Sequence, residues 1–496
     1  MGPQLVIGID LGTTGCRAVA YSETARPVAR HYLEYGLTHP APGADEQEAE
    51  GWWSAARVCL KEVVAQLADA EAVVALGVSA QGHSWVPTEA NLRPLRPALT
   101  WLDTRAAPMA QELLKERGAH FWGHQAGKTP GAWHALPQIL WLRQQEPQSV
   151  LAASHYLFAH DFLVARLTGE LVTDFTTAAG SLLFNIREFE WDRALGYAYQ
   201  VDVRRFAPAQ PAGAVAGHLR WEAARDLGLP AGIPVAVGAQ DQKCAALAAG
   251  IQPGVATVSL GTSTAITAIT RHATFDEAAA IPCFPYLSRD TWVLEAPLTT
   301  TGGALRWLRD FIRGAGAQEL SYEQLDDLAA AAPVGSNGVR FLPFLAGAGA
   351  PHWDAEARGC VTGLSLDTTP GDVARALLEG VALEIAENVA AMQRQGVPVE
   401  RLRLFGGGAR SDLWARIIAS VTGLRVERST DVEAAAAGAA ILALTAAGLC
   451  ETPTEGQVRF SAPADVVTPR PTPEYTELAR DYARVRDAHL ESAGAG

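Results

Sequence analysis

The feature that most constrains this chain is a strand–turn–strand pattern that occurs twice. Near the start, the apolar segments 5–10 and 17–21 flank a polar turn with the sequence LGTTG. The pattern returns 249 positions later, in residues 255–269, around the turn LGTST. Two apolar strands joined by a short Gly/Thr turn are typical of a β-hairpin. Leu-Gly-Thr is a common tripeptide, but the shared strand context argues against chance and predicts two related lobes, each opening with a hairpin.

Strands alternate with helical segments through the rest of the 496 residues. Residues 73–79 read as a buried strand, and residues 369–395 as a helix with Pro370 near its start, where helices tolerate proline. This alternation indicates an α/β fold. We expect the lobes to divide just before the second hairpin, into residues 1–248 and 249–496.

One alanine-rich segment resembles a membrane span by composition. Residues 432–449 read VEAAAAGAAILALTAAGL. They include Glu433, and their small side chains allow a helix to approach a sheet closely. We therefore expect a buried helix and no membrane partner.

Charge and cysteine content exclude several classes of protein. The net charge is −14 and no run is rich in lysine or arginine, so a nucleic-acid partner is not expected. Six scattered cysteines form no C-x-x-C pair, which argues against a zinc site and favours a reducing compartment. The N-terminus enters an apolar strand without a basic signal region, so we expect a cytoplasmic protein.

The first turn has the composition of a phosphate-binding site. Gly12, Thr13 and Thr14 would direct N–H and O–H donors into one concavity. Arg17 would add a positive charge, and Asp10 would hold a hydrated Mg²⁺. A plain hairpin is the alternative, and the second turn of the same kind favours phosphate.

A carboxylate follows the strand at residues 234–240. At the carboxyl end of a strand, Asp241 would project into a cleft and could take the proton of an attacking hydroxyl. Capping of the helix that follows is an equal alternative.

Two glycine-rich segments differ in what they predict. Residues 406–408 are three glycines between a strand and a helix, where a flat ligand could approach the backbone or the chain could simply turn. Residues 123–129, GHQAGKT, resemble a P-loop but have one residue too few between the glycines and no preceding strand.

Taken in order, these motifs closely resemble the FGGY carbohydrate kinases, and within them the xylulokinases. The segments that carry the resemblance are IGIDLGTTGCRA (7–18), WLDTRA (101–106), DFLVARLTGELVTDFTTAAGSLLF (161–184), GAQDQ (238–242), VSLGTS (258–263), LPFLAGAGAPHWDAEARG (342–359), LLEGVALEIAENV (377–389) and LFGGGARSDLWARIIASVTG (404–423).

The resemblance implies a two-lobed ribonuclease-H-like fold, as in actin and hexokinase, with a cleft between the lobes. It implies that Asp241 is the catalytic base, that ATP is the phosphoryl donor and that Mg²⁺ is bound near Asp10 through water. The nucleotide-binding residues that we predict are Gly12, Thr13, Thr14, Arg17, Gly261, Thr262, Gly303, Arg306, Gly407, Gly408 and Asp412.

The sugar-binding residues predicted by the resemblance are Gln81, Gly82, His83, Asp103 and Gln242. Xylulokinases typically have Met-His-Gly where this chain has Gly82-His83-Ser84. The segment GAGAPHWD resembles the glycerol kinase form, yet the Arg-Glu pair of glycerol kinases is absent after Gln81. D-xylulose is the favoured substrate; L-xylulose, D-ribulose, erythritol and glycerol remain alternatives.

Two other functions fit parts of the sequence. A non-metabolic actin-like ATPase would also have paired phosphate hairpins, but would lack polar side chains converging on a sugar. A sugar-sensing pseudokinase is disfavoured by the intact GAQDQ segment. We expect a small-molecule sugar or polyol as partner and leave open assembly as a homodimer.

Overall fold

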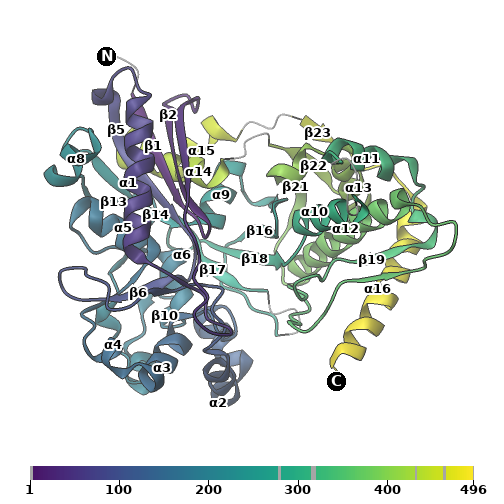
Figure 1. Ribbon diagram of the computed structural model, residues 1–496, viewed down its shortest axis with the longest axis horizontal. Helices are drawn as coiled ribbons and strands as arrows, with labels where there is room; N and C mark the ends of the chain where they lie inside the picture. Colours follow the sequence, from purple (N-terminus) through teal and green to yellow (C-terminus); the bar gives the residue numbers. More distant parts are fainter. Residues whose placement is uncertain (1–3, 278–280, 314–319, 430–432, 462–464, 495–496) are drawn as a thin grey trace.

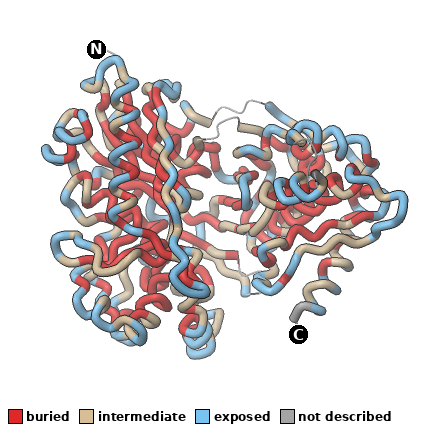
Figure 2. Tube along the Cα trace, viewed as in Figure 1, coloured by how far each residue is buried: buried red, intermediate tan, exposed pale blue. Residues whose placement is uncertain are grey.

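The fold is given by a computed structural model that describes residues 4–277, 281–313, 320–429, 433–461 and 465–494. Two sheet-rich lobes lie side by side, with the chain ends at opposite sides of the molecule (Figure 1). Buried segments run through both lobes, and exposed segments lie at the periphery (Figure 2). The two-lobed α/β architecture is as predicted.

The first sheet has six strands built around the first hairpin. Its order is β13 (Val215–His218), β14 (Pro234–Gln240), β5 (Val73–Ala80), β1 (Leu5–Leu11), β2 (Gly15–Ser22) and β3 (Pro27–Glu34). β1 pairs antiparallel with β2 and parallel with β5. The predicted hairpin and the predicted strand at 73–79 are both confirmed.

The second sheet repeats this plan. Its order is β17 (Cys283–Pro285), β18 (Trp292–Leu298), β16 (Thr264–Thr270), β15 (Gly254–Ser259), β21 (Val399–Phe405), β22 (Arg425–Arg428) and β23 (Asp465–Val467). β15 pairs antiparallel with β16 and parallel with β21, as β1 does with its two neighbours. The hairpin repeat seen in the sequence is therefore a repeat of sheet topology.

Further elements complete the two lobes. A small sheet in the first lobe contains β4 (Glu46–Gln47), β7 (Ala98–Leu99), β6 (Trp85–Thr88) and β8 (His155–Phe158). Besides the alanine-rich helix described below, the helices of ten or more residues in the described ranges are α1 (Ala49–Ala65), α2 (Ala107–Ala126), α3 (Ala135–Gln145), α5 (Ala159–Thr168), α10 (Gly302–Arg313), α11 (Tyr322–Ala331), α12 (Pro370–Arg394), α13 (Asp412–Thr422) and α16 (Pro473–Gly494).

Helix α12 begins where its sequence predicts. Thr369 is the N-cap residue, and its hydroxyl accepts the backbone N–H of Asp372, whose carboxylate in turn accepts the N–H of Thr369. Pro370 occupies the first helical turn, where its missing N–H has no intrahelical role. This capping box fixes the start of the longest helix in the described ranges.

The alanine-rich segment forms the buried helix α14 (Ala434–Ala446), as expected. It packs on the first sheet, although in sequence it lies between β22 and β23 of the second sheet. A Cβ atom on Gly8 would lie 1.9 Å from the Ala436 carbonyl oxygen, and one on Gly77 would lie 1.9 Å from that of Ala439. Glycine is therefore required at both strand positions. In the part of the chain that the structure describes, no helix combines the length and apolarity that crossing a bilayer requires.

Helix α9 (Asp241–Ala249) lies against α14, and the contact is equally close. A Cβ on Gly438 would lie 2.0 Å from the carbonyl oxygen of Cys244. Both helices can meet only because their facing residues are small.

The β17–β18 hairpin of the second sheet reaches the first lobe. The N–H of Cys283 donates to the Gly127 carbonyl at 2.9 Å, and the indole of Trp292 donates to the Ile186 carbonyl at 2.8 Å. These bonds bring side chains of the second sheet next to residues of the first lobe.

We predict that Gly8→Ala destabilises the fold, because its methyl group would overlap a helix backbone carbonyl. The expected cost is about 1–3 kcal/mol or more in the free energy of unfolding. Gly36→Ala is the matched control, since nothing lies within 4 Å of a Cβ there. Thermal unfolding of both variants checks the prediction, and equal melting temperatures would contradict it.

Candidate active site

The turn between β1 and β2 leaves donors available. The N–H of Gly12 donates to the Gly15 carbonyl at 2.9 Å, and the Thr13 carbonyl accepts a hydrogen bond from the Gln47 side-chain amide at 2.6 Å. The N–H groups of Thr13 and Thr14 donate to no other residue in the described ranges. A turn held from its carbonyl side with free N–H groups has the arrangement of an anion nest.

The turn between β15 and β16 is tied to the start of α10. The carbonyl of Gly261 accepts the N–H of Gly302 at 2.9 Å, and the carbonyl of Thr262 accepts the N–H of Gly303 at 2.9 Å. A Cβ on Gly303 would lie 3.1 Å from the Thr262 carbonyl oxygen. Gly303 thus allows the helix to begin directly against the turn.

A pocket of about 420 Å³ lies beside this second turn. Five residues from the predicted nucleotide set line it together: Gly261, Thr262, Arg306, Gly407 and Gly408. Its size suits a nucleoside-sized ligand. The glycines after β21 therefore lie next to the second turn, as binding of one ligand by both would require.

Two residues of the predicted nucleotide set are engaged elsewhere. The guanidinium of Arg17 lies 2.6 Å from the carboxylate of Glu433 and stacks over the Tyr32 ring. Asp412 pairs with Arg428 at 2.6 Å and lines a different pocket of about 370 Å³. Neither Arg17 nor Asp412 is among the residues that line the pocket beside the second turn.

Asp241 is the first residue of α9, directly after β14. The N-cap residue is Gln240, so Asp241 does not cap the helix; its carboxylate accepts the N–H of its neighbour Gln242 at 2.8 Å. Burial raises the pKa of Asp241 to about 7, and the negative charge of Asp10 adds to the shift. A carboxyl group with a pKa near the working pH suits a general base. The side chain of Gln242 makes no hydrogen bond in the part of the chain that the structure describes.

Asp10 lies on β1, and its carboxylate accepts a hydrogen bond from Ser79 at 3.0 Å. Burial raises the pKa of Asp10 to about 6. Desolvation raises the pKa of both half-buried carboxyl groups, and the charge of Asp10 adds to the shift of Asp241; a bound cation would offset both charges. Among the described residues no group of three or more His, Cys, Asp or Glu side chains is arranged to hold a metal ion.

The predicted sugar residues after β5 lie close to Asp241's neighbour Gln240. Gln81 is buried and donates to Gln47 at 2.8 Å. A Cβ atom at position 82 would lie 3.0 Å from the side-chain amide carbon of Gln240. Gly82 therefore leaves the Gln240 side-chain amide uncovered. His83 has a left-handed backbone, with φ of 65°, and its Nδ1 lies 3.4 Å from the Gly180 carbonyl oxygen. Burial lowers the pKa of His83 to about 3, so its ring is neutral.

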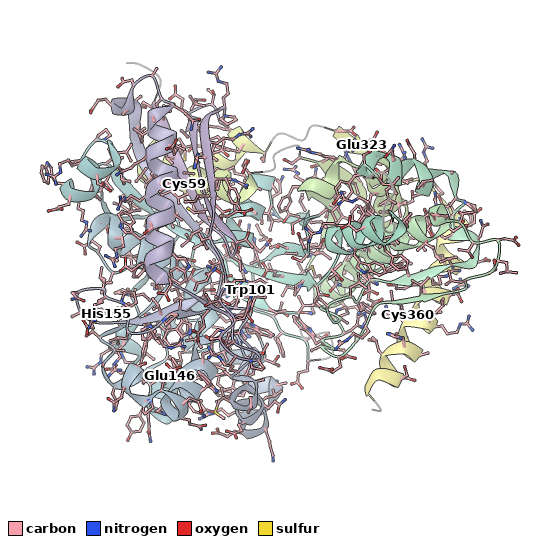
Figure 3. All side chains as sticks on the ribbon, in the orientation of Figure 1. Cys59, Trp101, Glu146, His155, Glu323 and Cys360 are labelled. Atoms are coloured by element: carbon pink, nitrogen blue, oxygen red, sulfur yellow. The ribbon has the colours of Figure 1, made fainter. Side chains whose placement is uncertain are left out.

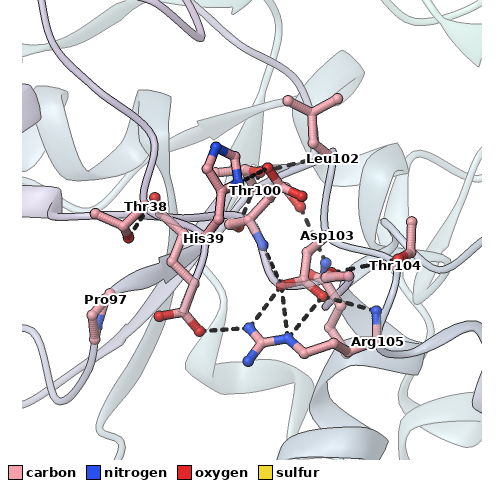
Figure 4. A network of polar contacts seen from close by, with 12 residues as sticks. Thr38, His39, Pro97, Thr100, Leu102, Asp103, Thr104 and Arg105 are labelled. Atoms are coloured by element: carbon pink, nitrogen blue, oxygen red, sulfur yellow. Dashed lines mark hydrogen bonds and ion pairs between the residues drawn. The ribbon is translucent and has the colours of Figure 1, made fainter. Parts of the chain in front are cut away.

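Asp103 lies in a buried ion-pair network rather than alone (Figure 4). Its carboxylate accepts the backbone N–H of Asp45 at 3.1 Å and pairs with Arg105 at 2.7 Å. Arg105 also pairs with Glu46, which binds Arg96. The carboxylate is occupied within the protein, so its contribution to sugar binding would be to hold this loop in place.

Trp101, in the same loop, is a site residue that sequence reasoning missed. Its side chain is 43% exposed although it is large and apolar. Its indole donates to the Thr13 hydroxyl at 2.8 Å. Figure 3 shows it near the middle of the molecule, on the side of the first lobe that faces the second. Its position in WLDTRA, two residues before Asp103, was the available signal.

A group of charged residues beside Asp241 was also missed. Lys243 and Lys128 are both buried against Phe284, and Lys243 pairs with Glu295 at 3.0 Å. Lys243 follows Asp241 by two positions, which was a usable signal. Lys128 belongs to the segment GHQAGKT, whose resemblance to a P-loop we set aside; nothing local indicates its true location.

Comparison with known proteins identifies the family of this chain. Residues 5–248 match the N-terminal domain of the FGGY family of carbohydrate kinases, and residues 256–447 match its C-terminal domain. A xylulose kinase from Staphylococcus epidermidis is 28% identical over 98% of this chain and 97% of its own length. A glycerol kinase from Trichodesmium erythraeum is 30% identical over 90% of each chain.

Solved structures agree. The crystal structure of a gluconate kinase from Lactobacillus acidophilus superposes with a TM-score of 0.92 at 25% identity and covers 100% of both chains. The relatives phosphorylate different sugars at comparable identity, so kinship gives the reaction class but not the acceptor. It also decides against a non-metabolic actin-like ATPase. The duplicated hairpins, the pocket beside the second turn and the matches over both halves show that this chain belongs to the FGGY family of carbohydrate kinases.

Proposed function

We propose that this kinase transfers the γ-phosphoryl group of ATP to a hydroxyl of a small sugar or polyol, with Asp241 as the base. The observation that carries the proposal is the placement of half-buried Asp241 at the end of β14, where desolvation and the charge of Asp10 raise its pKa to about 7. A base with this pKa is largely deprotonated in mildly alkaline cytoplasm and can still accept a proton from an alcohol.

The proposed mechanism is an in-line displacement. Asp241 orients the acceptor hydroxyl and takes its proton as the oxygen attacks phosphorus. N–H groups of the two turns, at Thr13, Thr14 and Thr262, stabilise negative charge on the phosphate oxygens. Asp10 would hold a hydrated Mg²⁺, which when bound would offset charge on the phosphates. Closure of the lobes, residues 1–248 and 249–496, would keep water from replacing the sugar.

We assign adenosine to the pocket of about 420 Å³ beside the second turn. Arg306, Gly407 and Gly408 would contact it, and Gly303 would act by keeping α10 close to the turn. Asp412 and Arg17 remain predicted nucleotide residues, but their ion pairs would have to rearrange for direct contact.

D-xylulose is our candidate among uncharged acceptors. The histidine His83 and the space left by the missing side chain of Gly82 support a pocket for a ketose. L-xylulose, D-ribulose, erythritol and glycerol are the alternatives. Gln81, Asp103 and Gln242 complete the proposed sugar set, with Asp103 acting through its loop. We further propose a cytoplasmic location; assembly as a homodimer stays a prediction.

Asp241→Asn should abolish phosphorylation while ATP binding persists, because the amide cannot accept the proton. Loss of the base predicts a fall in kcat of about 10²–10⁴-fold. Coupled ADP release measures turnover, and calorimetric titration with an ATP analogue measures binding. Asp367→Asn, at an exposed carboxylate, is the control. Turnover near that of the wild type in Asp241→Asn would refute the assignment of the base.

Acidification should inactivate the enzyme by protonating Asp241. We expect kcat/KM to fall about tenfold per pH unit below a midpoint near 7. The profile is measured with Mg²⁺ in constant excess and at fixed ionic strength. A profile that is flat from pH 5 to 8 would contradict this.

The same shift in pKa has a consequence for stability. Between the ordinary value of 3.8 and about 7, the folded protein holds the Asp241 proton more tightly than the unfolded chain does, so stability falls as pH rises through this window. Asp241→Asn should therefore melt at a higher temperature than wild type at pH 8. Its advantage should shrink towards pH 4, and scans at both pH values test it.

His83→Ala should weaken kcat/KM for the preferred uncharged sugar much more than it changes KM for ATP. A pocket built around a hydroxyl loses a hydrogen bond when the partner is removed. Kinetics with D-xylulose, L-xylulose, D-ribulose, erythritol and glycerol check this, with the exposed His120→Ala as control. If glycerol or erythritol exceeded D-xylulose by about tenfold, the ketopentose assignment would be wrong.

A further inference from the structure

Two buried lysines meet at one aromatic ring beside the proposed base. The ammonium groups of Lys128 and Lys243 each lie 3.7 Å from the centroid of Phe284, and the residues are only 3% and 1% exposed. Lys128 follows helix α2, Lys243 lies in α9, and Phe284 lies on β17 of the second sheet. Three distant segments thus build one cationic cluster.

The two lysines differ in how their charge is balanced. Lys243 lies 3.0 Å from the Glu295 carboxylate and donates to the Gln240 side-chain oxygen at 2.8 Å. Lys128 donates to the Ala179 carbonyl at 3.0 Å, but no carboxylate among the described residues lies within ion-pair distance of it. Burial and the charge of Lys243 hold the pKa of Lys128 well below its usual range. A buried ammonium without a counter-ion is costly, and an arriving anion would relieve that cost.

The histidines nearby do not supply a counter-charge. His83 and His134 pack edge to face, with ring centroids 5.2 Å apart. Burial lowers the pKa of both rings, and the lysine charges add to the shift. The positive charge of the cluster therefore belongs to the lysines.

This cluster is continuous with the proposed acceptor site. Lys128 binds the carbonyl of Ala179, and His83 lies against the carbonyl of the next residue, Gly180. Gln240 directly precedes Asp241, and its amide nitrogen is buried with no hydrogen-bond partner in the described part of the chain. The Gln240 amide thus lacks the acceptor that burial normally requires, and Lys128 has a carbonyl acceptor but no carboxylate at ion-pair distance.

We propose that Lys128, assisted by Gln240 and Lys243, forms an anion subsite in the acceptor pocket, and that the enzyme prefers polyhydroxy carboxylates over uncharged sugars of equal chain length. This inference rests on the proposed kinase function. D-xylulose remains the candidate among uncharged acceptors, and a carboxylate at the end of the acceptor away from the reacting hydroxyl adds a charge-assisted hydrogen bond.

The first test compares matched ligands on the full-length protein. D-gluconate is paired with D-glucitol, and D-xylonate with xylitol, in calorimetric titrations and in the coupled ADP assay. We expect each acid to bind at least about tenfold more tightly than its uncharged partner. Lys128→Met should remove that preference while changing affinity for the uncharged partner by less than about threefold.

Two controls separate a binding role from a structural one. Lys61→Met removes an exposed lysine that pairs with Asp226, and should leave the preference intact. Lys128→Met should melt no lower than wild type, because it removes an unbalanced buried charge. Lys128→Arg should retain part of the preference.

Each result decides the inference. Equal affinity for acids and uncharged partners would overturn it, as would a Lys128→Met variant that weakens both alike or raises KM for ATP, which would indicate that the amine serves a phosphate. If acids bind through Lys128 but no acceptor releases ADP, the subsite stands and the kinase proposal fails. If ketoses are phosphorylated while acids neither bind nor compete, the subsite fails and the kinase proposal stands.

Discussion

The close packing of helix α14 on the first sheet is the contact on which the rest of this structure depends. Gly8 and Gly77 allow two carbonyls of the helix to approach strand backbone, and Gly438 allows α9 to approach from its other side. Because α9 begins with Asp241, the position of the proposed base follows from contacts between small residues. A single added methyl group in this layer would act on the fold and on the base together.

Two carboxylates and two lysines lie close to this layer of helices. Desolvation raises the pKa of both Asp10 and Asp241, the charge of Asp10 raises that of Asp241 further, and two lysines share the ring of Phe284 nearby. Burial makes each of these charges unfavourable in the protein alone. Natural proteins retain such groups mainly where a ligand or a reaction uses them, so the carboxylates and the lysines indicate ligands of opposite charge.

The site is built by both lobes even before any ligand is considered. Phe284 and Glu295 belong to the second sheet, yet they contact lysines from the first half of the chain. The hydrogen bond from Cys283 to Gly127 fixes this junction. Acceptor binding would therefore be sensitive to the placement of one lobe against the other, which links sugar recognition to the geometry of phosphoryl transfer.

By itself the sequence determined the elements whose signals are local: the two hairpins, the capped start of α12, the buried alanine-rich helix and the strand that ends before Asp241. Turn, cap and periodicity signals act within a few residues, so one segment is enough to read them. Only the tertiary structure decided which charges meet. It pairs Arg17 with Glu433, surrounds Asp103 with arginine, and brings Lys128 to Lys243 across more than a hundred residues. Coulombic interaction and desolvation depend on distance and burial in space, and no pattern along the chain encodes either.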